Sequence, residues 1–277
     1  MPMNMEAEKM SLHFLSRFSR EIMPFCSFLA TTGTSHAYLG WMTKIQFLPA
    51  LLALNVGVVV ALVLLTLVFG RVYCSVICPM GVLQDVISGL RNRSKKARAR
   101  FAFSPAKTVM RYAFLAAFVV LMVLGLTSVA SLIAPYSAFG RIATNLVQPI
   151  YIGINNYLAS VAEHYDSYAF YHVDTWLKSG ISLAVAAVTL VLIAVLAWRN
   201  GRTYCNTVCP VGTLLGLLSR FAIFRPQIDL SKCNGCTLSS RKCKASCSDA
   251  KNHKIDYSRC VACMDCNENC TQKAIAY

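Results

Sequence analysis

The sequence predicts an α-helical polytopic membrane protein with a small α+β domain at its C-terminal end. Three observations lead to this fold class. Of 277 residues, 56% are hydrophobic and only 14% are charged, whereas soluble globular chains are about one quarter charged. Long uncharged stretches alternate with short basic ones, and most of the 13 cysteines fall in repeated motifs. This composition excludes a disordered chain, because disorder requires low hydrophobicity.

Three uncharged stretches are long enough to cross a membrane, since a spanning helix needs about 20 apolar residues. They are Ile45–Gly70, Tyr112–Gly140 and Ser179–Trp198. Soluble core helices are the alternative, but helices that are apolar all round over this length are typical of membranes. Ile22–Thr43 is a weaker candidate for a fourth span at the N-terminus, and Ile142–Ala162 is expected to be interfacial or re-entrant. No signal peptide is predicted at the N-terminus.

The net charge of +15 comes entirely from two segments. Residues 91–111 carry eight cations and no acid, and residues 199–277 carry twelve cations and five acids. Because Lys and Arg collect in cytoplasmic loops, both segments are expected on the cytoplasmic side. This role as a topology determinant accounts for the basic run, so nucleic-acid binding is not predicted.

A nineteen-residue repeat follows two of the apolar stretches. Gly70–Ser88 and Gly201–Ser219 are identical at nine positions, with the pattern G-R-x-Y-C-x-x-x-C-P-x-G-x-L. The residue before a proline avoids the α region, so a helix should break at the second cysteine of each motif. The prolines, Pro79 and Pro210, should then open the next helix. Both motifs are expected at the cytoplasmic face.

The repeats supply a candidate redox or metal site at the membrane face, formed by Cys74, Cys78, Cys205 and Cys209. Free N–H groups and the dipole at a helix N-terminus favour anions, including thiolates. The four cysteines are expected to form a redox dithiol pair or a further metal centre; the alternative is that they are small buried hydrophobes. The invariant positions of the motif have supporting roles: Gly81 and Gly212 allow close backbone approach, and Arg71 and Arg202 either anchor the helices at the headgroup level or stabilise a reduced centre. Cys26 stands alone, and its expected role is packing.

The last fifty residues hold two cysteine quartets, spaced C-x2-C-x6-C-x3-C and C-x2-C-x2-C-x3-C. So short a segment buries little apolar surface and needs a metal or disulfide to stabilise it. In two-cluster ferredoxins the fourth cysteine of each run ligates the other cluster. This crossing over predicts cluster I on Cys233, Cys236, Cys243 and Cys270, and cluster II on Cys260, Cys263, Cys266 and Cys247. Zinc is the competing metal, and disulfides are disfavoured in the cytoplasm.

The tail resembles the bacterial two-[4Fe–4S] ferredoxins, and also contains an internal repeat, IDLSKCNGC and IDYSRCVAC, offset by 27 residues. It departs from them at Ser248 and Thr271, which stand where proline usually follows the fourth cysteine. Both kinds of cysteine motif together resemble the 4Fe–4S membrane ferredoxins over Ile45–Tyr277. This family includes a membrane quinol dehydrogenase subunit and polyferredoxin-like accessory proteins. The resemblance implies a multi-pass protein of the bacterial inner (cytoplasmic) membrane that exchanges electrons with quinol or quinone and with a protein redox partner.

The sequence thus predicts an N-terminal segment (1–44), a membrane domain (45–224) and a ferredoxin-like domain with two [4Fe–4S] clusters (225–277). The leading hypothesis is electron transfer between the quinone pool or a redox partner and the two clusters. A membrane-tethered accessory protein for metal-centre assembly or regulation is the alternative, and a structural zinc module on a membrane anchor is a third. No catalytic residue is predicted, and no Rossmann or P-loop motif supports a nucleotide cofactor.

Overall fold

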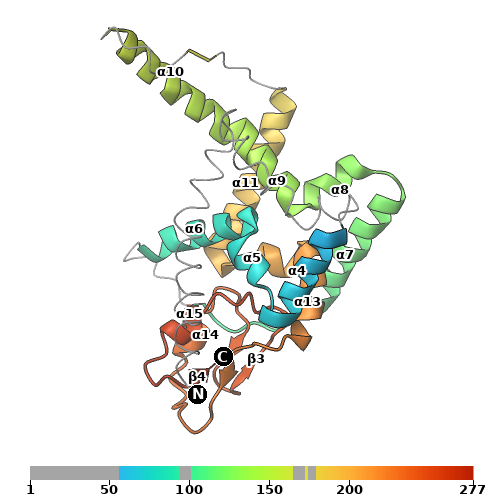
Figure 1. Ribbon diagram of the computed structural model, residues 1–277, viewed down its shortest axis with the longest axis vertical. Coiled ribbons are helices and arrows are strands. Elements are labelled where there is room, and N and C mark those ends of the chain that lie inside the picture. Colours follow the sequence, from blue (N-terminus) through green and yellow to red (C-terminus); the bar gives the residue numbers. More distant parts are fainter. Residues whose placement is uncertain (1–55, 94–100, 165–171, 174–178, 277) are drawn as a thin grey trace.

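The computed structural model describes residues 56–93, 101–164, 172–173 and 179–276, and this part of the chain is mostly helical. Figure 1 shows the longer helices above a small domain of short helices and strands, which contains the C-terminal end of the chain. Ile22–Thr43 and Cys26 lie outside the described residues, so the prediction of a fourth span and that of a packing cysteine both stay predictions.

The two membrane repeats fold into matching helical units, offset by 131 residues as in the sequence. The first unit is α4 (Val56–Phe69), α5 (Val72–Val76) and α6 (Pro79–Arg93). The second unit is α11 (Gly180–Asn200), α12 (Thr203–Thr207) and α13 (Pro210–Leu218).

Each unit bends at the same two places. Gly70 and Gly201 follow the long helices with φ of 71° and 66°, a backbone conformation that favours glycine. Cys209 is extended, with φ −68° and ψ 118°, and Pro210 then occupies the first turn of α13. This confirms the prediction that the helix breaks at the second cysteine and restarts at the proline.

Of the described helices, only α11 is both long and apolar enough to cross a membrane. The stretch Tyr112–Gly140 is not one helix, because α7 (Thr108–Val123) ends before Gly125, where φ is 74°, and the chain turns. The apolar α4 is described only from Val56 onward. The described residues therefore do not form the three continuous spans that the sequence predicts.

The segment after α7 is a bent series of helices. It consists of α8 (Thr127–Ile133), α9 (Pro135–Ile142), the π-helical turn η1 (Ala143–Val147) and α10 (Gln148–His164). Ile142–Ala162, expected to be interfacial or re-entrant, thus continues α9 as a helix, and α10 extends away from the rest of the described chain (Figure 1). Within η1, the Asn145 amide donates to the Arg141 carbonyl oxygen (2.9 Å) and accepts from the Ser182 hydroxyl (3.0 Å) of α11.

The backbone pattern of the tail occurs twice at an offset of 27 residues, and the repeat extends well beyond the nine-residue segment that is similar in sequence. A 3-10 turn, η2 (Ser219–Phe221), precedes it. Its first half is β1 (Gln227–Ile228), α14 (Leu238–Lys242) and β2 (Ser248–Asp249), and its second half is β3 (Lys254–Ile255), α15 (Asp265–Glu268) and β4 (Ile275–Ala276). The strands pair antiparallel between the halves, β1 with β4 and β2 with β3. Neither half therefore forms a sheet without the other.

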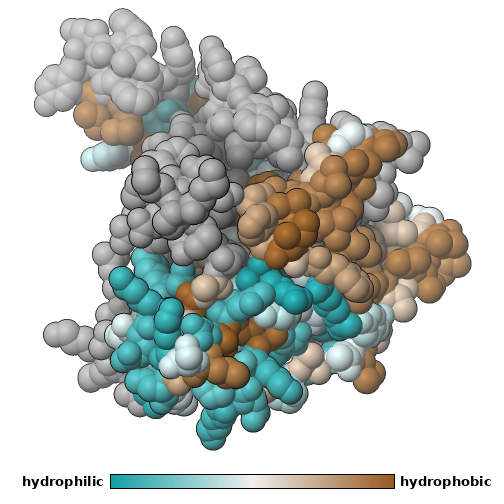
Figure 2. All heavy atoms as spheres, turned by 60° about the horizontal axis from the view of Figure 1, so that its bottom comes forward, coloured by the Kyte–Doolittle hydropathy of each residue, from teal (hydrophilic) through white to brown (hydrophobic). Residues whose placement is uncertain are grey.

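The tail and the membrane repeats share one core. Buried Cys243, Ala245, Cys247 and Val261 of the tail belong to the same cluster of apolar side chains as Leu62, Tyr73 and Leu215 of the helices. Hydrophobic side chains gather over the helices at the right of Figure 2, whereas the tail presents mainly hydrophilic ones. On α7, Val109 and Val123 are more than 80% exposed, which is unusual for a helix that faces water.

Gly201 determines how the tail meets the second repeat, and we expect its replacement by alanine to be far more damaging than Gly70→Ala. Both glycines have positive φ, so each substitution strains the backbone by about 1–3 kcal/mol. A Cβ on Gly201 would also lie 2.4 Å from the Lys244 carbonyl oxygen, which accepts the Arg202 N–H, whereas on Gly70 it would meet only the Ala222 Cβ at 3.9 Å.

The measurement is the apparent melting temperature of each purified variant in detergent, followed by size-exclusion chromatography of heated samples. The Gly201→Ala protein is expected to melt several degrees below Gly70→Ala. Equal melting temperatures for the two variants would show that the contact with Lys244 does not hold the tail in place.

Candidate functional site

The two repeats are joined by a reciprocal exchange of arginines. Arg71 of the first repeat donates to the Cys205 carbonyl oxygen of the second (3.1 Å), and Arg202 of the second donates to the Cys74 carbonyl oxygen of the first (3.0 Å). The arginines are 0% and 1% exposed. Anchoring at the headgroup level is therefore wrong for both, because neither side chain reaches the surface.

Steric reasons explain why glycine stands at the same position in both motifs. A Cβ on Gly81 would lie 2.1 Å from the Cys74 carbonyl oxygen, and one on Gly212 would lie 2.2 Å from that of Cys205. Real Cβ atoms do not approach so closely, so only glycine lets each new helix start against the carbonyl that the opposite arginine binds. The expected close backbone approach is thus confirmed.

The four repeat cysteines Cys74, Cys78, Cys205 and Cys209 are buried together in the shared core, each at most 5% exposed. Burial, together with the neighbouring Cys205 and Cys74, raises the pKa of Cys78 to about 12. Burial also raises the pKa of Cys205 to about 11 and that of Cys209 well above its ordinary value. As free groups the thiols of Cys78, Cys205 and Cys209 are therefore neutral at pH 7.

The N–H groups at the helix N-termini lower the pKa of Cys78 and Cys209, as expected, but burial raises the pKa by more. The Gly212 N–H points at the Cys209 Sγ (3.3 Å). A stable thiolate here therefore requires a metal ion or a further cation. Thiols with raised pKa values suit a site that becomes negatively charged only when a metal is bound.

Two polar side chains that the sequence analysis did not single out contact this site. The Gln84 side chain donates to the Cys205 Sγ (3.1 Å) and is 0% exposed, while its Oε1 has no hydrogen-bond partner among the described residues. Asp85 binds Arg202 with both carboxylate oxygens, at 2.8 and 2.7 Å. Both residues follow Leu83, which is identical in the two repeats. Asp85 could have been noticed in the sequence, because it is the one acidic residue in Gly70–Ser88.

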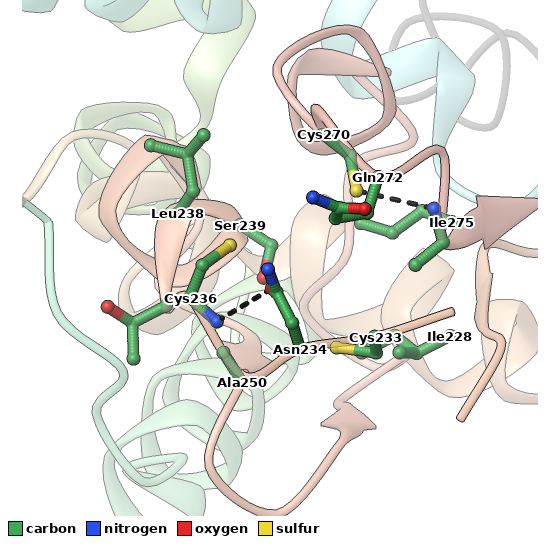
Figure 3. Close-up of a pocket in the computed structure, with 12 residues that line it drawn as sticks. Ile228, Cys233, Asn234, Cys236, Leu238, Ser239, Ala250, Cys270, Gln272 and Ile275 are labelled. Atoms are coloured by element: carbon green, nitrogen blue, oxygen red, sulfur yellow. Dashed lines mark hydrogen bonds between the residues drawn. The ribbon is translucent and has the colours of Figure 1, made fainter. Parts of the chain in front are cut away.

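In the tail, three of the four cysteines predicted for cluster I line one pocket. Cys233 and Cys236 come from the first half of the tail and Cys270 from the second, as Figure 3 shows. The Ala274 N–H donates to the Cys270 Sγ (3.4 Å). The walls are largely apolar, including Ile228, Leu238 and Ile275. Cys236 is exposed, so this pocket opens toward the surface.

Three of the cysteines predicted for cluster II, Cys247, Cys260 and Cys263, lie against the membrane repeats, and the fourth, Cys266, is half-buried outside that core. Cys247, from the first half, is 2% exposed and interacts with the Cys260 thiol of the second half. Cys260 and Cys263 pack against the core that holds the repeat cysteines. Cys243, predicted for cluster I, instead has its Sγ 3.5 Å from that of Cys247. A hydrogen bond from the Cys247 thiol lowers the pKa of Cys243 and raises that of Cys247.

The backbone around the tail cysteines has an unusual and repeated shape. Gly235 and Thr237 flank Cys236 with φ of 69° and 58°, and the corresponding Ala262 and Met264 have φ of 50° and 60°. Where right- and left-handed backbone conformations alternate, successive N–H groups point toward a common centre. This arrangement, called a nest, binds anions and occurs at many iron–sulfur sites. Non-glycine residues adopt this conformation at a cost, which indicates a functional constraint.

The donor set fits iron–sulfur clusters. All eight predicted ligands are thiols, the ligands that hold [4Fe–4S] clusters. Within the described ranges, no three His, Cys, Asp or Glu side chains are placed to hold one metal ion. The ligands of a cubane bind different irons, so they need only face a common pocket. The assignment of individual cysteines to each cluster stays a prediction, supported by Cys270 beside Cys233 and by Cys247 beside Cys260.

Comparison with known proteins gives a match to a family model described as a 4Fe-4S binding domain, over residues 51–98 and 180–230. The match covers both membrane repeats with their four cysteines and ends before Cys233. The chain is also similar to curated proteins that are named as ferredoxin-type proteins.

Three relatives illustrate this relationship. The uncharacterized protein MJ0749 of Methanocaldococcus jannaschii is 35% identical over 36% of this chain and 41% of its own length. The ferredoxin-type protein NapH of Escherichia coli is 29% identical over 68% of this chain and 52% of its own. The regulatory protein NosR of Stutzerimonas stutzeri is 23% identical over 73% of this chain and 24% of its own. The chain thus spans about half the length of these relatives or less, and no solved structure matches it.

The buried ion pair of Arg202 with Asp85 should be essential for stability. Removing one partner of a buried pair leaves an unpaired charge and costs about 3–5 kcal/mol. We expect Asp85→Asn to lower the free energy of unfolding by about this amount. The matched control is Asp229→Asn, which breaks the exposed pair of Asp229 with Lys232, whose side chains are 40% and 63% exposed.

An exposed pair is worth about 1 kcal/mol or less, so the control should melt close to the wild type in a detergent thermal shift assay. If Asp85→Asn and Asp229→Asn were equally stable, the buried pair would not hold the repeats together.

Proposed function

We propose that the chain is a membrane-bound iron–sulfur protein that passes electrons between the quinone pool, or a redox partner, and two [4Fe–4S] clusters. The observation that carries this proposal is the distribution of the eight tail cysteines over two places. Three of them line the outer pocket, and four others, Cys243, Cys247, Cys260 and Cys263, belong to or pack against the core shared with the repeats. The relatives named as ferredoxin-type proteins support the same function.

The ligands would be shared between the halves of the tail. Cys233, Cys236, Cys243 and Cys270 would hold cluster I, and Cys247, Cys260, Cys263 and Cys266 would hold cluster II. A cluster supplies one-electron chemistry at a potential set by its charge, hydrogen bonds and exposure. The protein supplies the apolar walls and the nests around Cys236 and Cys263.

We further propose a multi-pass arrangement in the cytoplasmic membrane, with the tail in the cytoplasm. The apolar α11 and the exposed valines of α7 support the contact with lipid. The tail carries an excess of Lys and Arg, as the loops on the cytoplasmic side of a membrane do. A protein redox partner on that side and quinol or quinone in the membrane would complete the path.

The four repeat cysteines are proposed to form a further site, either a metal centre or a redox dithiol pair. Their burial next to two guanidinium groups favours a centre that becomes anionic when it is loaded. The match of both repeats to a 4Fe-4S binding domain favours a metal centre. Iron stoichiometry separates the alternatives, because a dithiol pair adds no iron to the roughly eight atoms of two cubane clusters.

A second candidate function follows from the relative that is named a regulatory protein. The chain would then be a membrane-tethered accessory protein for regulation or metal-centre assembly. In that case the clusters would form, but added quinol would not reduce them.

The test is quinol-dependent reduction of the anaerobically purified protein, followed by EPR. We expect about eight or more irons per chain, cubane signals, and reduction by quinol. Cys74→Ala should abolish reduction by quinol while dithionite still reduces the tail clusters. Cys26→Ala is the matched control, since Cys26 belongs to no motif, and it should behave as the wild type.

A colourless protein loaded with zinc would contradict the proposal as a whole. Clusters that dithionite reduces and quinol does not, in the wild type, would favour the accessory function. Unchanged quinol reduction in Cys74→Ala would exclude the repeat cysteines from the path.

A further inference from the structure

The two symmetry-related arginines differ in how their charge is balanced. Arg202 binds Asp85 through both carboxylate oxygens, and Lys244 lies 3.6 Å from Asp85 and 3.0 Å from Asp265. These four residues form a neutral chain of two cations and two anions. The repeat offset places Gly216 at the position of Asp85 in the second repeat, so Arg71 has no corresponding carboxylate.

Every contact of Arg71 among the described residues is to a neutral group. It donates to the Asn206 Oδ1 (2.8 Å) and to the carbonyl oxygens of Ser258 (3.1 Å) and Cys205 (3.1 Å), and it lies 3.9 Å from the Cys74 Sγ. Its Nε has no hydrogen-bond partner in that part of the chain. A guanidinium that is 0% exposed and lacks a counter-ion is costly to bury.

The surroundings of Arg71 add further positive charge. Arg111, 4% exposed, donates to the Ser258 hydroxyl (3.0 Å) and carbonyl oxygen (3.1 Å), so two guanidinium groups share one carbonyl. Arg111 fits because the opposing residue is Gly216, where a Cβ would lie 2.7 Å from its guanidinium. The nearby carboxylate, Asp256, is paired with Arg259. In the described part of the chain, the charged side chains around Ser258 are thus three cations, Arg71, Arg111 and Arg259, and one anion, Asp256.

The place of this excess charge indicates its function. Arg71 contacts Cys74 and Cys205 on one side, and on the other it binds Ser258, two residues before Cys260. It thus lies between the repeat cysteines and the inner tail cysteines, which are the cluster II cysteines that share the core with the repeats (Cys247, Cys260 and Cys263). Cys233, Cys236 and Cys270, which line the outer pocket, belong to neither side of this contact.

We infer that Arg71, which unlike Arg202 is paired with no carboxylate among the described residues, is the counter-charge of the inner cluster and sets its reduction potential. The inference rests on the proposed function. A cubane held by four thiolates is anionic, and reduction adds one electron and one negative charge without making or breaking a bond. A fixed buried cation stabilises the reduced form more than the oxidised form, because it interacts more strongly with the greater charge. Arg71 therefore raises the potential of the cluster on Cys247, Cys260, Cys263 and Cys266.

The experiment is a potentiometric EPR titration of the full-length protein with dithionite in detergent. For Arg71→Gln we expect the inner cluster to be about tenfold less reduced at a given potential, a shift of about 59 mV for one electron. The outer cluster should titrate as in the wild type and is the internal control. Arg71→Lys keeps the charge and should restore most of the potential, while exposed Arg220→Gln should change neither cluster.

An inner-cluster potential unchanged in Arg71→Gln, or an equal shift of both clusters, would overturn the inference. If Arg71→Gln loses iron, Arg111→Gln replaces it as the test, because Arg111 is the second cation bound to Ser258. Its removal should lower the reduction potential of the inner cluster as well. An unchanged potential in Arg111→Gln would then overturn the inference. The proposed function fails separately, if the wild type shows no cubane signals.

Discussion

The exchange of two buried arginines between the repeats is the interaction on which the rest of the structure depends. A buried guanidinium must find partners for its donors, and Arg71 and Arg202 find them on the carbonyl oxygens of the opposite repeat. Neither repeat can therefore form its cysteine turn alone. The same pair also holds the tail, because Arg71 binds Ser258 and the Arg202 N–H binds the Lys244 carbonyl oxygen.

The same principle of exchange between halves recurs in the tail. Its strands pair only across the halves, and Cys247 and Cys270 each lie with cysteines of the other half. The result is two unequal places for a cluster. The inner one shares a core with the membrane repeats, and the outer one opens to the surface at Cys236. This order suits transfer of electrons from a membrane site to a partner in solution.

The sequence alone was sufficient for features that depend on local chemistry. The break before Pro210 and the need for Gly81 both follow from backbone sterics, and both are found. The break of Tyr112–Gly140 at Gly125 was missed, because hydropathy counts apolar residues and is insensitive to one turn. Asp85 could have been noticed as the one acid of the first repeat, but its partner and that of Ser258 could not be predicted, since both partners lie more than 100 residues away. Of the two roles expected for Arg71 and Arg202, anchoring at the headgroup level is wrong, because their burial depends on this same long-range pairing.

The proposed arrangement of the tail requires that each cluster takes ligands from both of its halves. Iron content and EPR of single variants test this requirement. We expect Cys247→Ser to remove the same signal as Cys263→Ser, and Cys270→Ser to remove the same signal as Cys236→Ser. Each variant should retain the other cluster, with about four irons lost. Removal by Cys247→Ser of the signal that is lost in Cys236→Ser would contradict the arrangement, since each quartet would then hold its own cluster.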